Sequence, residues 1–219
     1  MTTRHQFDEA LKDLRCKIIR LGSMVETRIV QGVDSLAKRD MKLADQVIKG
    51  DTEVNDLQAD IEEQCMLLIA TQQPLAKDLR KIVTGFKISI YLERIGDLAV
   101  DIAKITLRIG DSPLIKPLID IPRMAAIVGQ MISKGLDSYI KEDEALAREM
   151  SEMDDEVDHL YKQIFRELLV FMMEDPKTIN QATYLLFFAR FLERMGDYCT
   201  NIAEEICYLI NGKRTDLNQ

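Results

Sequence analysis

Several residue types are scarce in this chain of 219 residues, which has no tryptophan, two histidines, five prolines and ten glycines. Because proline and glycine are the residues that most disfavour helices, their scarcity predicts an all-helical protein, as does the abundance of Leu, Ile, Ala, Glu, Lys and Met. The most apolar stretch, residues 184–188, is soon followed by Arg190 and Glu193. It is well short of the ~20 apolar residues that a membrane helix needs. We therefore expect no direct membrane insertion.

Basic residues are outnumbered by acidic ones, 29 to 37, so the formal charge is −8 and the pI is about 5.0. This balance argues against nucleic acid as a partner, because phosphate backbones are held by clustered Lys and Arg. A signal-peptide type of N-terminus is also absent, and we expect a cytoplasmic protein. The four cysteines, none in a C-x-x-C pair, are expected to be reduced thiols in a helical core: Cys16, Cys65, Cys199 and Cys207.

The chain contains an internal repeat. The segments 32–40 and 135–143 match without a gap, 103 positions apart, and the match continues through Asp51/Asp154 and Leu57/Leu160. A second block, YLERIGD at residues 91–97, returns as FLERMGD at residues 191–197, 100 positions apart. A period near one hundred residues is too long for a solenoid unit and suits a duplicated small domain.

Hydrophobic periodicity predicts three long helices in each half. In the first half, apolar residues recur at threes and fours over residues 7–37, 43–68 and 77–109. The densest cluster of helix breakers follows at residues 110–113, with Pro117 and Pro122 close behind. We therefore predict an all-α fold of two tandem antiparallel three-helix bundles. The first spans residues 1–110 and the second residues 123–219, joined by a Pro-rich linker at residues 111–122.

Acidic residues recur on the second and third helix of each half with a spacing of four, which places them on one helix face. The candidate site residues are Asp51, Asn55, Glu93, Asp97 and Asp101 in the first half and Asp154, Asp158, Glu193, Asp197 and Asn201 in the second. Like charges at this spacing repel, and their burial is costly without partners. Either protein cations such as Arg94 and Arg194 neutralise the acids, or solvent does, or a metal ion does. Carboxylate and amide oxygens suit Mg²⁺, Mn²⁺, Fe or Ca²⁺.

His159 lies in an E-x-x-H pattern with Glu156, a spacing used in carboxylate-bridged di-iron bundles. Those sites need two such motifs, and the equivalent stretch at residues 53–56 has no histidine. The pattern therefore argues against a ferritin-like oxidase, and we expect His159 on the surface. The sequence also lacks a nucleophilic triad, a Gly-rich phosphate loop and a dinucleotide fingerprint.

Over nearly its whole length the chain resembles the PhoU family of bacterial phosphate-signalling proteins. Residues 93–103 and 193–203 resemble the family signature, and residues 154–158 resemble its partner motif. The resemblance implies six helices in two bundles, iron or zinc at the paired motifs of some members, homodimers or larger oligomers, and no catalytic activity. It also implies negative regulation of phosphate uptake, through the phosphate ABC transporter and the membrane sensor kinase. Asn55 and Asn201 stand where the pattern has acids, and an amide is a neutral, weaker ligand.

Two classes of function follow from these observations. The first is a cytoplasmic adaptor that regulates phosphate uptake and phosphate-responsive signalling, with metal ions (Fe, Zn, Mn or Mg) at the paired carboxylates. The alternative is a metal-dependent or metal-storing carboxylate-cluster protein with its own activity. A purely structural helical bundle would show neither a metal nor a regulatory phenotype.

Overall fold

The computed structural model describes residues 3–217, and the predicted outer ends of the two repeats, residues 1 and 219, lie outside this range. The described chain is helical, as expected. In the first half the helices are α1 (Thr3–Lys38), α2 (Met41–Lys49), α3 (Asp51–Gln72) and α4 (Ala76–Ile109). In the second half they are α5 (Asp120–Lys141), α6 (Glu144–Glu152), α7 (Asp154–Glu174), the 3₁₀ turn η1 (Pro176–Thr178) and α8 (Ile179–Asn211).

The second helix of each half is divided in two, whereas the apolar periodicity predicted one continuous helix. The short helices α2 and α6 are capped at their N-termini by Asp40 and Asp143, whose side chains accept hydrogen bonds from backbone N–H groups of the first turn. Gly50 follows α2 and Met153 follows α6, and these two residues separate the short helices from α3 and α7. The sequence did not reveal the division because both residues keep right-handed helical dihedrals, so the apolar spacing continues across them.

Gly50 also allows a close approach of another helix. Arg28 of α1 donates to the Gly50 carbonyl at 3.3 Å and to Glu53 at 2.9 Å. A Cβ at residue 50 would overlap the Arg28 guanidinium. In the second half the position of Arg28 is taken by Met131 and that of Gly50 by Met153, which packs against the apolar core. The same bend is therefore held by polar contacts in one repeat and by apolar packing in the other.

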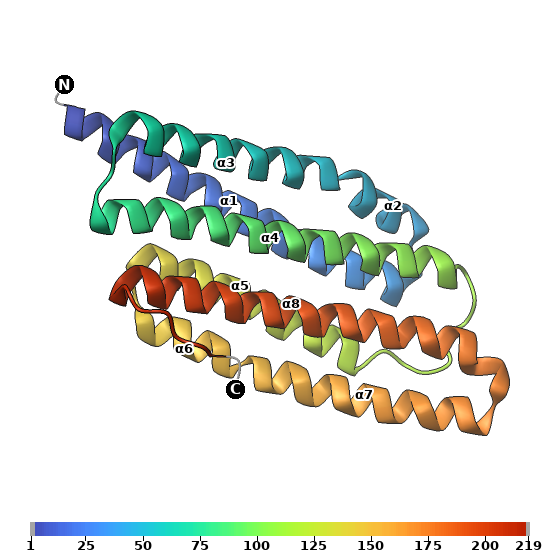
Figure 1. Ribbon diagram of the computed structural model, residues 1–219. Coiled ribbons are helices and arrows are strands. Elements are labelled where there is room, and N and C mark those ends of the chain that lie inside the picture. The colour runs from blue at the N-terminus through green and yellow to red at the C-terminus, as the bar shows by residue number, and fades with distance from the viewer. Residues whose placement is uncertain (1–2, 218–219) are drawn as a thin grey trace.

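The two halves lie side by side and share one apolar core (Figure 1). Helices α4 and α8 run antiparallel through the middle of the molecule, with α1 and α5 beside them and α3 and α7 on opposite outer sides. The core cluster extends from residues of α1 such as Ile18 to residues of α8 such as Phe188. The connection between the halves leaves α4 at Gly110, and α5 begins at Asp120, so residues 120–122 of the expected linker are helical.

Charged side chains also join the halves. Glu205 of α8 is only 4% exposed, and its Oε1 accepts hydrogen bonds from Lys87 of α4 at 2.6 Å and from Arg214 at 3.2 Å. Two cations offset the cost of burying this carboxylate. At the repeat-related positions, the pair is replaced by the apolar residues Phe187 and Ile105, which line one shallow pocket. The contact between α4 and α8 therefore contains a charged pair, Lys87 and Glu205, at one place and two apolar residues, Ile105 and Phe187, at the repeat-related place.

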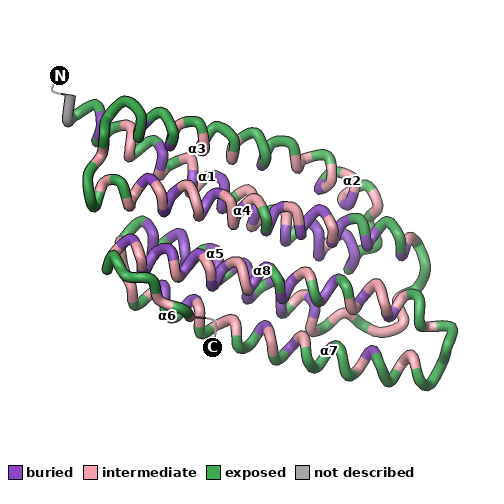
Figure 2. Tube along the Cα trace, viewed as in Figure 1, coloured by how far each residue is buried: buried purple, intermediate pink, exposed green. Residues whose placement is uncertain are grey.

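The outer helices expose more of their surface than the central ones (Figure 2). Apolar residues stand out on them at repeat-related positions, Met66 and Leu67 on α3 and Leu169 and Val170 on α7. Leu75 and Met173, at the two hairpins, are 81% and 75% exposed. Within residues 3–217 no helix combines the length and the apolarity required to cross a bilayer. Cys65, Cys199 and Cys207 are buried free thiols, as expected, whereas Cys16 is exposed on α1, contrary to the expected core position.

Candidate metal centres

The first acidic cluster joins the start of α3 to the middle of α4. Asn55 Nδ2 donates to Asp51 Oδ2 at 3.0 Å, so these two residues form a pair on α3. On α4, partial burial and the neighbouring charges of Asp97 and Asp51 raise the pKa of Glu93. Partial burial and the charge of Asp51 likewise raise the pKa of Asp97. In the first repeat, α3 and α4 therefore bring their acidic residues together.

Arg94 neutralises part of this cluster. Its guanidinium lies 3.5 Å from Asp97 and 3.6 Å from Glu93, and the Arg94 side chain is itself exposed to solvent. Asp101, one turn further along α4, pairs instead with Lys104 at 2.8 Å. The sequence left open whether protein cations or a metal ion neutralise the acids. In the first half, Arg94 and Lys104 already neutralise part of the acidic charge.

The second acidic cluster is more deeply buried. Asp154, the first residue of α7, lies over Gly196 of α8, where a Cβ would overlap Asp154 Oδ1. Glycine at residue 196 therefore permits this close approach. Asp154 Oδ2 accepts a hydrogen bond from the buried Thr200 hydroxyl at 3.3 Å. Glu193, only 7% exposed, pairs with Arg190 through its Oε1.

Two carboxylate oxygens in this cluster are buried without a hydrogen-bond partner in the described structure, Asp154 Oδ1 and Glu193 Oε2. Burial, together with the charges of Asp197 and Asp158, raises the pKa of Asp154 to about 7. Burial also raises the pKa values of Glu193 and Asp197. A buried polar group without a partner costs about 1–3 kcal/mol. The second cluster therefore has an electrostatic cost that a bound cation would relieve.

The remaining predicted ligands lie at the edges of the clusters. Asp158 pairs with Lys162 at 3.0 Å, although its charge still raises the pKa of Asp197. Asn201 forms no side-chain hydrogen bond with any of residues 5–217, whose side chains the structure describes. His159 is exposed, and its Nδ1 contacts the carbonyl of Asp155 in its own helix at 2.6 Å, as expected for a surface residue.

The sequence does not identify Thr200 as part of the second cluster. Thr200 looks like an ordinary buried hydroxyl in a helix, and no spacing rule connects it to Asp154. Arg190 is one of the protein cations close to the motif, and the structure pairs it with Glu193. The repeated glycine was the available signal, because Asp154 of α7 packs directly over Gly196 of the motif.

The donor types in both clusters fit a hard or borderline cation, because they are carboxylates with nearby amide and hydroxyl oxygens. Among the described residues, however, no three His, Cys, Asp or Glu side chains are already arranged so that they could hold one metal ion. Metal binding would therefore require side chains such as those of Asp158 and Asp197 to move from their present positions.

A family model for the PhoU domain matches this chain twice, over residues 18–106 and 121–206. The chain belongs to the PhoU family. The two matches coincide with the two halves that the internal repeat defines, and the members compared below are accessory or regulatory proteins of phosphate transport, not enzymes. The repeated motif and the acids on both helices of each half are therefore features of a PhoU domain pair.

Curated relatives are similar over almost the entire chain. A protein of Clostridium acetobutylicum named "Phosphate-specific transport system accessory protein PhoU homolog" is 43% identical over 217 residues, which cover 99% of each chain. A protein of Caulobacter vibrioides with the same name is 41% identical, covering 96% of this chain and 92% of its own.

Solved structures of the family have the same fold. The crystal structure of PhoU from Pseudomonas aeruginosa superposes with a TM-score of 0.90 at 34% identity, over 94% of this chain and all of the other. That of the phosphate transport system regulatory protein PhoU from Streptococcus pneumoniae gives a TM-score of 0.89 at 28% identity. These matches confirm the all-helical fold with six long helices and two repeats.

The raised pKa of Asp154 predicts that metal-free protein loses stability as the pH rises. In the folded state Asp154 keeps its proton up to a pKa of about 7, whereas in the unfolded chain it releases the proton near the ordinary aspartate pKa of 3.8. Between these values the folded state binds more protons, so the free energy of unfolding falls with increasing pH. Asp154→Asn, which cannot ionise, should be more stable than the parent at pH 8 by about 1–2 kcal/mol after allowance for solvent screening.

Urea denaturation in the presence of a chelator, at pH 5 and pH 8, measures this difference. Asp155→Asn is the matched control, because Asp155 is the next residue on α7 and is exposed. The stabilisation by Asp154→Asn should be larger at pH 8 than at pH 5, and the control should show no such change. Parallel pH profiles for Asp154→Asn and the parent would contradict this account of the site.

Proposed function

We propose that this protein is a negative regulator of phosphate uptake and of phosphate-responsive signalling. It acts in the cytoplasm as an adaptor between the phosphate ABC transporter and its sensor kinase. The observation that carries the proposal is the full-length match to phosphate-specific transport system accessory proteins, at 43% identity and 99% coverage of both chains. An identity of this size over two complete repeats supports a shared role as well as a shared fold.

The exposed apolar residues support the adaptor role. Met66, Leu67 and Leu75 lie near the α3–α4 hairpin, and Leu169, Val170 and Met173 lie near the α7–α8 hairpin. We call these the first and second apolar patches. The hairpins are at opposite ends of the molecule (Figure 1), so the duplication provides two similar docking surfaces that face different directions. Exposed apolar patches mark protein interaction sites. One patch can dock the transporter or the kinase, and the other can join a second copy in a homodimer.

The second part of the proposal is that the acidic clusters bind metal, with Fe, Zn, Mn and Mg as candidates. Asp154, Glu193, Asp197 and Asp158 would hold the ion in the second half, and Asp51, Asn55, Glu93 and Asp97 in the first. The bound cation would supply positive charge against the repulsion among these acids. Support comes from the unpartnered oxygens of Asp154 and Glu193, which occur in the second cluster. We therefore expect the second cluster to bind more tightly.

Deletion of the gene should raise phosphate uptake in phosphate-rich medium and switch on phosphate-responsive transcription, because the negative regulator is lost. A plasmid copy of the parent gene should restore both. A complementing gene that carries Leu67→Glu and Leu75→Glu, or Val170→Glu and Met173→Glu, should fail to restore them although the protein accumulates. Val30→Glu changes an exposed apolar residue outside both patches and is the control. Unchanged uptake and transcription in the deletion strain would rule out the regulatory role.

Metal binding is tested by elemental analysis of protein purified without a chelator. The parent should retain metal, Asp197→Ala should lose most of it, and Asp97→Ala should lose less, because the first cluster is already neutralised by Arg94. Asp45→Ala, which removes an acid paired with Lys49 on α2, should retain the parent's metal content. Addition of the retained metal to stripped protein should raise the melting temperature of the parent and of Asp45→Ala but not of Asp197→Ala. Equal metal content in all four proteins would refute the assignment.

A further inference from the structure

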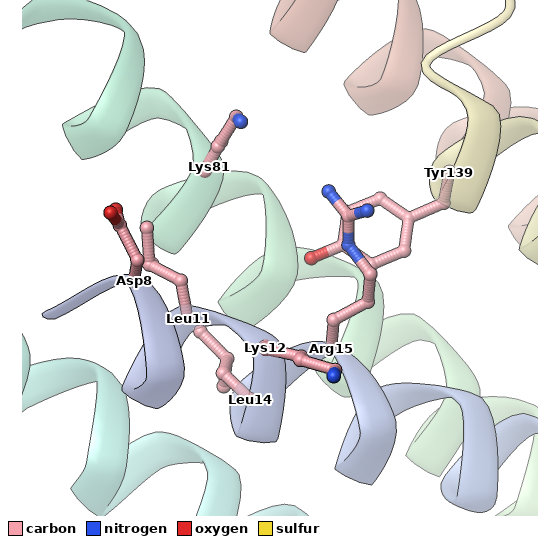
Figure 3. Close-up of a pocket in the computed structure, with 7 residues that line it drawn as sticks. All are labelled: Asp8, Leu11, Lys12, Leu14, Arg15, Lys81 and Tyr139. Atoms are coloured by element: carbon pink, nitrogen blue, oxygen red, sulfur yellow. The ribbon is translucent and has the colours of Figure 1, made fainter. Parts of the chain in front are cut away.

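A pocket of about 210 Å³ lies where the N-terminal part of α1, the start of α4 and the end of α5 meet (Figure 3). The residues that line it are Asp8, Leu11, Lys12, Leu14, Arg15, Lys81 and Tyr139. It is separate from both acidic clusters. Since α1 and α4 belong to the first repeat and α5 to the second, a ligand in this pocket would touch both halves.

The charge around the pocket is positive, although the protein carries −8 in total. Glu142, at the end of α5, is shared by three cations: Lys77 at 2.8 Å, Lys81 at 3.1 Å and Arg15 at 3.6 Å. Hydrogen bonds from Lys77 and Lys81 hold the pKa of Glu142 below its usual value, so it stays ionised. With Lys12 and Asp8 on the rim, four cations face two carboxylates. The local excess of two positive charges matches a dianion.

Two donors of the pocket have no hydrogen-bond partner within residues 5–217, whose side chains the structure describes. Lys12 forms no ion pair there. The Tyr139 side chain is 4% exposed, and its hydroxyl points from α5 toward the residues of α1 and α4 (Figure 3). Burial raises the pKa of Tyr139 to about 12, so the hydroxyl keeps its proton and can donate it in a hydrogen bond. Because Tyr139 lines the pocket, an oxyanion bound there would supply an acceptor for this hydroxyl.

The other repeat shows that packing does not require these polar groups. Leu36 occupies the position of Tyr139 and is 1% exposed, and Arg39 occupies the position of Glu142. The helix corner therefore forms equally well with an aliphatic side chain at this place. The tyrosine hydroxyl and its surrounding cations distinguish one end of the molecule from its duplicate.

We propose that this pocket binds a phosphate-class oxyanion, with monohydrogen phosphate as the smallest ligand. Lys12, Arg15, Lys81 and Tyr139 donate hydrogen bonds to its oxygens, and the carboxylate of Asp8 accepts the hydrogen bond from its P–OH group. Sulfate has the same charge and shape but no proton to donate, so Asp8 favours phosphate over sulfate. The choice of phosphate among oxyanions rests on the regulatory role proposed above, whereas the pocket stands on its own geometry.

Calorimetric titration of the purified full-length protein with orthophosphate, at constant ionic strength, tests the proposal. Saturable binding of one phosphate per chain is expected. Lys12→Gln, Arg15→Gln and Tyr139→Phe should each weaken it about tenfold or more, since each removes a hydrogen bond to a charged group. Arg108→Gln and Lys42→Gln remove exposed cations outside the pocket and should leave the affinity unchanged. Asp8→Asn should reduce the preference for phosphate over sulfate.

Competition with pyrophosphate and ATP identifies the source of the phosphate group. Tighter binding of either through the same residues would support the pocket and assign it to a larger phosphorylated molecule. An absence of saturable binding by all three would overturn the proposal, and so would binding that survives the three pocket substitutions. Lys12 is exposed, so its variant is informative even if Arg15→Gln fails to fold. Failure of this experiment leaves the deletion phenotype untouched, so the two proposals fail separately.

Discussion

The antiparallel packing of α4 against α8 determines where the other features of the molecule lie. Both helices are apolar on more than one stripe, which allows each to contact its own repeat on one side and the other repeat on another. Their burial removes from water a row of large side chains that includes Ile88, Leu92, Phe188 and Leu192. Each such side chain contributes about 1.5–3 kcal/mol. This contact holds the two repeats in one body and places the acidic motifs of both on the outer sides of the pair.

The same packing explains why the acids can be tolerated. A cluster like the one at Asp154 costs a few kcal/mol, because its carboxylates are partly desolvated and repel one another. The apolar side chains buried around the cluster contribute free energy that offsets this cost. The destabilised carboxylates are available to respond to a metal ion. The two repeats differ in this respect. The exposed Arg94 pairs with Asp97 in the first cluster, whereas in the second cluster Asp154 Oδ1 and Glu193 Oε2 have no hydrogen-bond partner among the described residues.

Much of this arrangement could be predicted from the sequence. The repeat, the long helices and the meeting of acids within each repeat follow from spacing, because helix period and short connections leave few alternatives. The division at Gly50 and Met153 could not be predicted, since the periodicity continues across it. The core shared by the two repeats could not be predicted either, because an apolar stripe on a helix does not show which other helix packs against it. In the sequence, Tyr139 is indistinguishable from an ordinary core aromatic residue. Its place beside Arg15 and Lys81 depends on the tertiary packing of α1, α4 and α5, which the sequence does not show.

The central claim is that the two repeats form one cooperative unit through α4 and α8, and the buried cysteines provide the most direct test. Cys65 lies in the first repeat and Cys199 in the second; both are buried, which raises their thiol pKa values and protects them from reagents. Pulsed thiol labelling across a urea series, read by mass spectrometry, reports the opening of each repeat, with exposed Cys16 as the always-labelled reference. The account predicts coincident midpoints for Cys65 and Cys199. Two separate transitions would contradict it, since the repeats would then be independent domains.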